Sequence, residues 1–391
     1  MPGMQSAAMT LLIDAGVEHD PADRIGTSTV LAEWLLRGAG DRDSRELTNH
    51  LDRLGLQRSS SVGIHHARFS SAALASNVLQ GLSAYADIVL RARLPADGFE
   101  PACDLAMQAL EGIGDDPRHA LSVKLRQCHF PDPLGRNTMG ELEHLKSLTP
   151  EDCRRQHAAC FKPAGAIIAF AGNIEATHVR NEVQHYLGNW KGHGPGLAIA
   201  DVPKQRTHHQ HQDSEQTHIG FAYSTIAESH ADYYAMRLAI EALGGGMSGR
   251  LFTEIREKRA LVYNVSAGYS SLKGVGSIMG YAGTSNDRAQ ATLECLLLEV
   301  RRLSQGISAD ELHRAKVVLK AGTIMSGEST SARSGSIAHD FFMRGRIRTM
   351  PEILNEIERV TLAHANRFLA DHPPGDMTIV TVGPKPLNSE G

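Results

Sequence analysis

Long apolar runs, paired cysteines and a strong net charge are all missing from this sequence. No stretch approaches the ~20 consecutive apolar residues that a membrane-spanning helix needs. The formal net charge is −4 over 391 residues, which gives no reason to expect nucleic acid or an anionic membrane as a partner. The N-terminus lacks a basic stretch and its apolar run contains Asp14, so we expect a strand there instead of a signal peptide.

The five cysteines are odd in number and scattered, with no Cys-x-x-Cys pair. They are Cys103, Cys128, Cys153, Cys160 and Cys295. This pattern agrees with reduced thiols in the cytoplasm, and free thiols in a periplasmic chain would agree as well. We therefore expect a cytoplasmic protein, with the periplasm as the second possibility.

The composition and length that remain are those of a globular protein with two domains. Hydrophobic residues make up 41% and charged residues 21% of the chain, enough to build large cores. A chain of 391 residues is too long for one ordinary domain, so two domains of nearly 200 residues each are the natural expectation.

An internal duplication with an offset of about 210 residues supports this division. The apolar segments 166–174 and 376–384 are both predicted strands, and each follows a helix and a Pro/Gly turn. Further upstream, 78–102 and 292–315 both predict a helix, a polar turn and a second helix. The alternative is a chance likeness between two unrelated domains that mix helices and strands.

The predicted fold is α+β, with two homologous α/β-sandwich domains in which helices pack on a mostly antiparallel sheet. The segment 188–216 is rich in Gly, Pro and polar residues and has no sustained period, so it is the expected linker. The N-terminal domain then covers residues 1–187 and the C-terminal domain residues 217–391.

A helix predicted over residues 28–38 carries the first candidate site. Ser28 or Thr29 could cap its N-terminus, and Gly38 or Gly40 could end it.

Val30, Glu33 and Trp34 have the i, i+3, i+4 spacing that places residues on one face of this helix. The surrounding pattern resembles the N-terminal domain of the pitrilysin/insulinase family, the inverted zincins, which carry His-x-x-Glu-His on this helix. The resemblance implies that Val30 and Trp34 replace the two His ligands and that Glu33 stands at the general base. It also implies that Glu111, 77 residues after Trp34, stands at the third ligand.

A catalytic zinc site needs three protein ligands and an open position for water. Valine has no donor atom and indole offers only an N–H group, so neither residue can bind a cation. We therefore expect no metal and no cofactor in this chain. Glu33 and Glu111 are then remnants, bonded to the scaffold or to each other, while Val30 and Trp34 line the core or a cleft.

Two further groups of histidines could be taken for metal sites. His65 and His66 are adjacent in a predicted strand, and His208, His209 and His211 cluster in the linker. Adjacent residues of a strand point to opposite faces, and the linker group lacks an acidic partner at fixed spacing. We expect no specific metal site at either place.

The strongest local motif is the segment 243–263, which contains Gly244, Gly245 and Gly246. Taken alone, three glycines before a helix predict a flexible turn or an anion site at the helix N-terminus. A Walker phosphate loop is not supported, because no Gly-Lys-Ser/Thr follows. The run after the glycines has helical spacing, and two strands about a Lys-Gly turn follow.

This segment closely resembles the C-terminal domain of the mitochondrial-processing-peptidase-like branch of the same family. In that branch an Arg and a Tyr seven residues later hold the substrate backbone near the scissile bond, which implies substrate-binding roles for Arg256 and Tyr263. A guanidinium can clamp a peptide carbonyl, and a phenol can donate to a developing oxyanion. The alternatives are a solvated helix charge for Arg256 and a core aromatic for Tyr263.

The resemblance extends over nearly the whole chain, although the first strand that relatives usually have before the position of Met1 is missing. It implies a non-catalytic subunit of a heterodimeric zinc metallopeptidase that pairs with a zinc-bearing homologous subunit and binds peptides or unfolded polypeptides. No activity is expected from this chain alone. The alternative is a non-proteolytic structural or assembly protein like the core subunits of respiratory complexes. A self-sufficient homodimeric peptidase is excluded by Val30 and Trp34.

Overall fold

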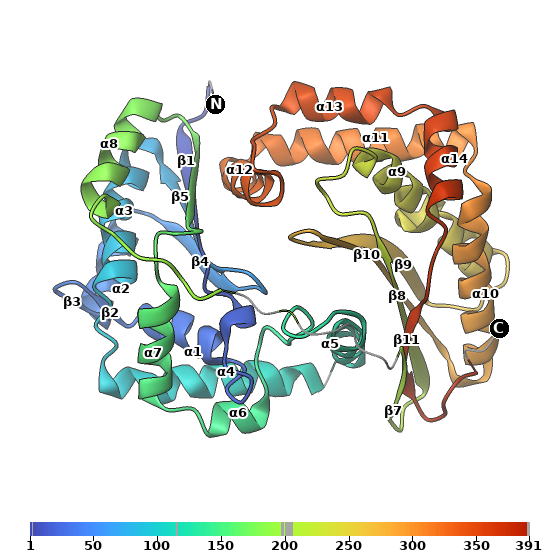
Figure 1. Ribbon diagram of the computed structural model, residues 1–391, viewed down its shortest axis with the longest axis horizontal. Coiled ribbons are helices and arrows are strands. Elements are labelled where there is room, and N and C mark those ends of the chain that lie inside the picture. The colour runs from blue at the N-terminus through green and yellow to red at the C-terminus, as the bar shows by residue number, and fades with distance from the viewer. Residues whose placement is uncertain (2, 115, 197–198, 200–205, 389–391) are drawn as a thin grey trace. The chain divides into compact units, whose positions relative to one another are not determined.

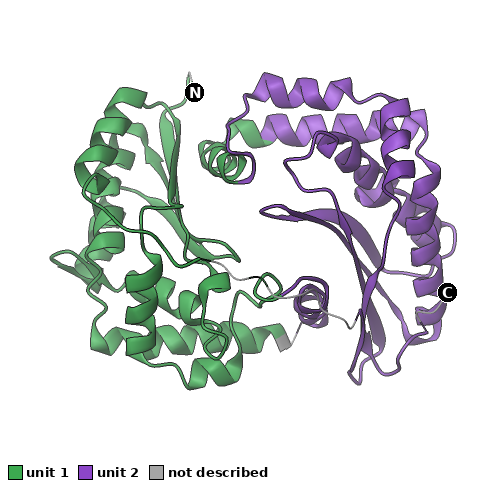
Figure 2. Cartoon of the chain, in the orientation of Figure 1, with its two compact units in different colours: residues 1–113, 132–200, 326–342 green, residues 114–131, 201–325, 343–391 purple. Residues whose placement is uncertain are grey.

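The computed structural model describes residues 1, 3–114, 116–196, 199 and 206–388, and its chain forms two compact units (Figures 1 and 2). Unit 1 contains residues 1–113, 132–200 and 326–342. Unit 2 contains residues 114–131, 201–325 and 343–391. Among the described helices, none is long and apolar enough to cross a membrane.

Unit 1 is built on a four-stranded antiparallel sheet in the order β4-β5-β1-β6. Its strands are β1 (Ser6–Ile13), β4 (Gln57–Val62), β5 (Ala67–Leu74) and β6 (Ile167–Gly172). The central strand β1 is almost entirely apolar and buried, as a strand covered on both faces must be. The helices of this unit are α1 (Thr27–Leu35), α2 (Ser44–Arg53), α3 (Ala75–Leu90), α4 (Phe99–Gly114), α6 (Leu142–Lys146), α7 (Pro150–Cys160), α8 (Ala176–Leu187) and most of α12 (Thr330–Arg344). A short hairpin pairs β2 (Gly38–Ala39) with β3 (Arg42–Asp43).

Unit 2 is built on a five-stranded sheet in the order β7-β11-β8-β10-β9. Its strands are β7 (Thr207–His211), β8 (Gln216–Thr225), β9 (Asn264–Leu272), β10 (Val275–Ser285) and β11 (Thr378–Gly383). The pair β11–β7 is parallel, whereas the other pairs of this sheet are antiparallel. The helices are α5 (Pro117–His129), α9 (Tyr233–Gly244), α10 (Ala289–Arg302), most of α11 (Ala309–Glu328), α13 (Met350–Arg359) and α14 (Leu362–Asp371).

The two units repeat one topology, which confirms the predicted α+β duplication. The order β4-β5-β1-β6 in unit 1 corresponds to β9-β10-β8-β11 in unit 2, with β7 added at the edge. Equivalent helices also begin with equivalent caps. The hydroxyl of Thr149 accepts from the Asp152 backbone N–H at the start of α7, and that of Thr361 accepts from the His364 N–H at the start of α14.

The helix α5 comes from the N-terminal half of the sequence but packs on the sheet of unit 2, and α12 comes from the C-terminal half but packs on the sheet of unit 1. The residues of the first contact are Leu121, Leu125, Cys128, Ala222, Val380 and Val382. On α12, Ala338 packs against Leu12 and Ala169, while the hydroxyls of Ser334 and Thr10 are 2.9 Å apart. Each sheet is thereby covered on the face that its own helices leave open.

The predicted boundaries at residues 187 and 217 do not describe these exchanged helices. Part of the predicted linker 188–216 is a strand, since β7 pairs with β11 in unit 2. Residues 197–198 and 200–205 of that segment lie outside the described residues. His208, His209 and His211 therefore belong to a sheet edge, which corrects their assignment to a linker.

The contact between α5 and its sheet makes stability depend on pH through His129. Its Nδ1 lies 3.1 Å from Thr378 Oγ1 and its Nε2 lies 2.9 Å from Ser277 Oγ, all three residues being buried. Burial, with the charges of Arg206 and Arg126, lowers the pKa of His129 to about 4.

We expect acid to weaken unit 2 through this histidine. Between pH ~6.5 and ~4 the unfolded chain binds a proton at His129 and the folded chain does not, so the free energy of unfolding falls as the pH is lowered. The expected loss over this window is about 2–3 kcal/mol. Urea unfolding of the wild type and of His129→Gln at several pH values measures it. A wild-type slope equal to that of the variant would contradict the assignment.

Candidate functional site

The helix α1 is capped from outside by Asp20. The Asp20 carboxylate accepts hydrogen bonds from the backbone N–H of Gly26 at 2.7 Å and of Ser28 at 2.9 Å, and from the Ser28 hydroxyl at 2.6 Å. Burial raises the pKa of this carboxyl to about 6, although the hydrogen bonds oppose the rise. The N-cap position is Gly26, so the expected capping by Ser28 or Thr29 is wrong. Both of these residues lie inside the first turn.

Val30 and Trp34 are fully buried core residues of unit 1. The indole N–H of Trp34 donates to the backbone carbonyl of Pro95 at 2.8 Å. Its ring meets the ring of Phe99 edge-on, with 5.1 Å between the centroids. The face of α1 that these two side chains occupy is therefore filled by apolar packing.

Glu33 and Glu111 lie apart from this packing. The side chain of Glu33 is 41% exposed and forms an ion pair with Arg37 at 3.6 Å. Glu111 is an exposed residue of α4. Among the described residues no hydrogen bond or ion pair joins Glu33 to Glu111. The donor set required for zinc does not fit these positions, because a valine and an engaged indole N–H supply no lone pair.

The glycine-rich segment shapes the end of α9. A Cβ atom at Gly244 would lie 2.4 Å from the backbone nitrogen of Ala267, so α9 can approach β9 this closely only at a glycine. Gly245 follows the helix end, and Gly246 has a φ of +70° at the start of a 3₁₀ turn. The three glycines are thus required by the backbone path.

Arg256 lies on a short π-helix, Phe252–Glu257, where the sequence predicted regular helical spacing. The backbone N–H of Lys258 donates to the carbonyl of Thr253, which is an i→i−5 bond. Glu254 is engaged by Lys258 at 2.6 Å and by Arg259 at 2.9 Å.

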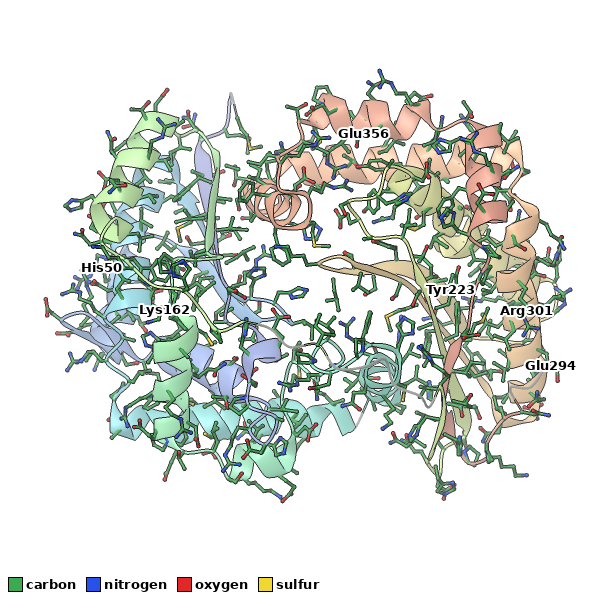
Figure 3. All side chains as sticks on the ribbon, in the orientation of Figure 1. His50, Lys162, Tyr223, Glu294, Arg301 and Glu356 are labelled. Atoms are coloured by element: carbon green, nitrogen blue, oxygen red, sulfur yellow. The ribbon has the colours of Figure 1, made fainter. Side chains whose placement is uncertain are left out.

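The guanidinium of Arg256 is exposed and stands over the Phe252 ring, 4.9 Å from its centroid. Because Glu254 already has two cationic partners, it does not neutralise Arg256. The charge of Arg256 is therefore held in place by an aromatic ring and remains available to a ligand. Arg301 on α10 is another exposed arginine of unit 2 (Figure 3).

Tyr263 is 64% exposed at the start of β9. Its backbone N–H donates to the carbonyl of Gly283 at 3.0 Å, which fixes the residue to β10. The side chain is not packed in the core, so the alternative of a core aromatic does not apply. Among the described residues, no hydrogen bond joins the side chains of Tyr263 and Arg256.

Arg250 anchors this region and was missed by the sequence reasoning. Its guanidinium donates to Glu311 Oε2 at 2.9 Å and to the carbonyl of Gly306 at 2.7 Å. Burial alone would raise the pKa of Glu311, but the hydrogen bonds from Arg250 and Ser308 lower it to about 2. Glu311 follows Arg250 by 61 residues, so no local pattern indicates the pair.

The two other histidine groups lie in a turn and at a sheet edge. His65 and His66 lie in the turn between β4 and β5, not in a strand as predicted. His65 Nδ1 is 2.8 Å from a carboxylate oxygen of Glu18. On β7, His209 Nδ1 is 2.9 Å from the Thr381 hydroxyl.

Comparison with known proteins shows what this chain is similar to. Residues 147–319 match the family described as "Peptidase M16 inactive domain". The chain is 23% identical over 387 residues to a Bacillus subtilis protein named "Uncharacterized zinc protease YmxG", which covers 98% of this chain and 94% of that protein. It is 24% identical over 374 residues to a protein of Mycobacterium tuberculosis also named a zinc protease, covering 94% of this chain and 85% of that protein.

Solved structures share the fold of the whole chain. The crystal structure of a peptidase M16 inactive domain from Pseudomonas fluorescens has a TM-score of 0.89 at 21% identity and covers 99% of this chain and 95% of that one. A protease from Helicobacter pylori has a TM-score of 0.87 at 19% identity, with 98% and 95% covered. A chain of complex III₂ from Candida albicans has a TM-score of 0.83 at 17% identity, with 98% and 92% covered.

The matched family region contains the glycine-rich segment, Arg256 and Tyr263, and the likeness to proteins named zinc proteases extends over nearly all of the chain. The chain accordingly has the fold of a peptidase M16 inactive domain, and its residues 147–319 match the model of that family.

Proposed function

We propose that this chain is the non-catalytic, substrate-binding subunit of a heterodimeric zinc metallopeptidase that cleaves peptides or unfolded polypeptides. The observation that carries the proposal is a contrast in burial between two pairs of residues. Val30 and Trp34 are buried without a metal-binding atom, while Arg256 and Tyr263 are exposed. A chain of this kind lacks the hydrolytic centre and keeps the groups that hold a substrate.

The chemistry proposed for this chain is binding and polarisation of the substrate backbone. Arg256 donates two N–H bonds to a peptide carbonyl. Tyr263 donates its phenol proton to the oxygen that becomes negative as water attacks the scissile bond. The zinc ion and the general base belong to a partner chain, a homologue with an intact His-x-x-Glu-His helix.

An extended substrate also needs a backbone partner, and β4 offers one. It is the edge strand of the sheet in unit 1, and five of its six residues are exposed. An added strand there would satisfy the unpaired N–H and C=O groups of the edge and bind peptides with little dependence on side chains. This supports unfolded polypeptides as the substrate class.

The cytoplasm remains the proposed compartment. All five cysteines are free and buried, which agrees with a reducing environment.

A non-proteolytic structural role is the second candidate. The fold shared with a chain of complex III₂ favours it, because that fold occurs within a large assembly. The two candidates differ in what accompanies the protein. A peptidase subunit co-purifies with a zinc-bearing homologue, whereas a structural subunit co-purifies with the other chains of an assembly.

The proposal is tested by reconstitution. The purified chain is mixed with its zinc-bearing homologue from the same organism, and cleavage of an unstructured fluorogenic peptide is followed. We expect no cleavage by this chain alone and a rise in activity that saturates at a one-to-one ratio. Equal activity of the homologue with and without this chain would reject the proposal.

A further inference from the structure

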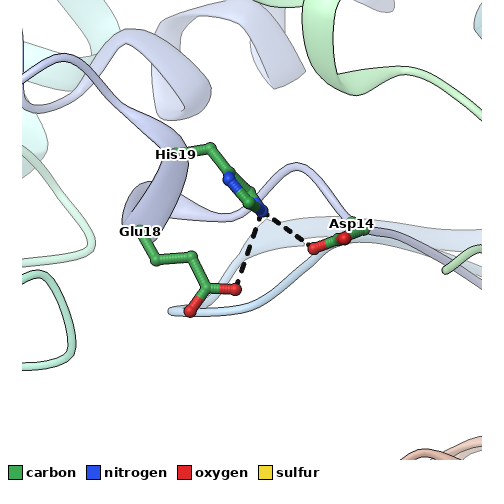
Figure 4. Close-up of side chains that lie close together, drawn as sticks. All are labelled: Asp14, Glu18 and His19. Carbon is green, nitrogen blue, oxygen red and sulfur yellow. Dashed lines mark hydrogen bonds and ion pairs between the residues drawn. The ribbon is translucent and has the colours of Figure 1, made fainter. Parts of the chain in front are cut away.

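Three potential metal ligands converge where β1 ends in unit 1. Asp14 follows the strand, and Glu18 and His19 lie in the 3₁₀ turn Val17–His19. His19 Nε2 points between the two carboxylates, 2.9 Å from Asp14 Oδ1 and 3.7 Å from Glu18 Oε1 (Figure 4). The three ligand atoms all lie within 4.8 Å of one another.

The two distances from His19 are close to those between the ligands of a bound transition metal. Bonds of about 2.0–2.1 Å to a tetrahedral zinc ion place neighbouring ligand atoms about 3.3 Å apart. The two distances from His19 Nε2 lie on either side of that value, so small side-chain adjustments would suffice. One imidazole and two carboxylates also cancel the charge of a divalent cation, and they leave one position for water.

The burial of the cluster makes a cation at this place favourable. The side chains of Glu18 and His19 are 5% and 4% exposed, and that of Asp14 is 34% exposed. Two carboxylates held close together, one of them buried, need positive charge between them. A divalent cation would supply that charge.

The surroundings hold the ligands in place, as an outer shell does at metal sites. His65 Nδ1 lies 2.8 Å from Glu18 Oε2, the oxygen that does not face His19. The backbone N–H of Glu18 donates to the carbonyl of Ile64 at 3.1 Å, which fixes the 3₁₀ turn to the β4–β5 turn. Beside Asp14, Gly165 has a φ of +82°, and a Cβ atom there would lie 3.1 Å from Asp14 Oδ2.

We propose that Asp14, Glu18 and His19 bind one divalent transition-metal ion of the zinc class. This site is distinct from the lost position on α1, and it departs from the expectation of no metal in this chain, which rested on α1 and the other histidine groups alone. Its role is structural: the ion fixes the end of β1 to the turn that carries Asp20, the cap of α1. The inference does not depend on the proposed peptidase function.

The test measures metal uptake by the full chain after removal of metals with a chelator. Zn²⁺ is titrated in competition with a chromogenic indicator, and Co²⁺ serves as a probe through its visible absorption. We expect one equivalent of Zn²⁺ and a tetrahedral or five-coordinate Co²⁺ spectrum. Asp14→Asn and His19→Asn should each weaken the affinity at least tenfold, and His65→Ala should weaken it about tenfold as an outer-shell change.

A matched control separates this site from adventitious binding to surface histidines. The triple variant His208→Asn, His209→Asn, His211→Asn alters β7 and should leave the affinity unchanged. Circular dichroism of each variant checks folding, and Asp14→Asn changes the most exposed ligand, so it is the least disruptive test. Three results would each overturn the proposal: no uptake of Zn²⁺, uptake that the β7 variant removes, or uptake that Asp14→Asn leaves intact. Stoichiometric binding of Mg²⁺ or Ca²⁺ with none of Zn²⁺ would also do so.

Discussion

Arg256→Ala is expected to lower the kcat/KM of the reconstituted two-chain peptidase about 100-fold, the usual effect of removing one preorganised donor from a reacting carbonyl. The guanidinium stands over Phe252 and is exposed, so its loss would remove the proposed substrate contact without opening a cavity. Steady-state cleavage of a fluorogenic peptide at a saturating ratio of the two chains measures the effect. Tyr263→Phe should act mainly on kcat, because its phenol proton matters most when charge develops on the substrate oxygen.

Arg301→Ala is the matched control for this experiment. It removes another exposed guanidinium from α10 of the same unit, and it should change kcat/KM by less than twofold. Titration of the partner should give the same one-to-one end point for both variants, which shows that pairing survives. If both arginine variants reduce activity equally, the effect is one of overall charge and Arg256 has no specific place at the scissile bond.

Trp34→Ala should carry the largest stability cost in the chain, about 3–5 kcal/mol. The indole is fully buried, its N–H group satisfies the carbonyl of Pro95, and its ring packs on Phe99. Removal creates a cavity and leaves a buried carbonyl without its donor. Urea unfolding followed by far-UV circular dichroism measures the loss. Trp34→His should be destabilising for the same reasons, so restoring the ligand at this position does not restore a zinc site.

Trp190→Ala supplies the comparison, because Trp190 is the second of the two tryptophans and is only partly buried. Its indole N–H donates to the carbonyl of Phe161 at 3.2 Å, so both variants lose an indole-to-backbone bond and differ mainly in burial. We expect Trp190→Ala to cost less than half as much. A Trp34→Ala protein as stable as the wild type would mean that α1 does not depend on this packing and that the helix face is open.

The duplicated topology could be predicted because its signals are local. Thr149 and Thr361 each precede a helix at matching distances from a β-branched strand, and these patterns recur at one offset. The exchange of α5 and α12 could not be predicted in this way. An apolar stripe such as that of Leu121 and Leu125 shows that a helix is buried, but it does not specify which of two similar sheets buries it.

The candidate site, too, could be predicted only where its signals are local. The spacing of Val30 and Trp34 on α1, and of Arg256 and Tyr263 beyond the glycines, identified positions that the structure places in the core and at the surface, respectively. The π-helix was not foreseen, because i→i−5 bonds leave the apolar spacing of a short segment almost unchanged. Asp14 and His19 escaped notice since their proximity depends on a turn whose backbone is held by distant residues.

The exchange of α5 and α12 between the two halves of the sequence has consequences for truncation of the chain and for its evolutionary origin. A polypeptide that stopped near residue 200 would keep Leu121 and Leu125 without their sheet and would leave Leu12 and Ala169 uncovered. Separate halves would therefore be insoluble when produced singly and would have to be synthesised together. An ancestor consisting of one half could have formed a domain-swapped dimer in which two identical copies exchanged this helix. Gene fusion would then have joined the two copies into one chain.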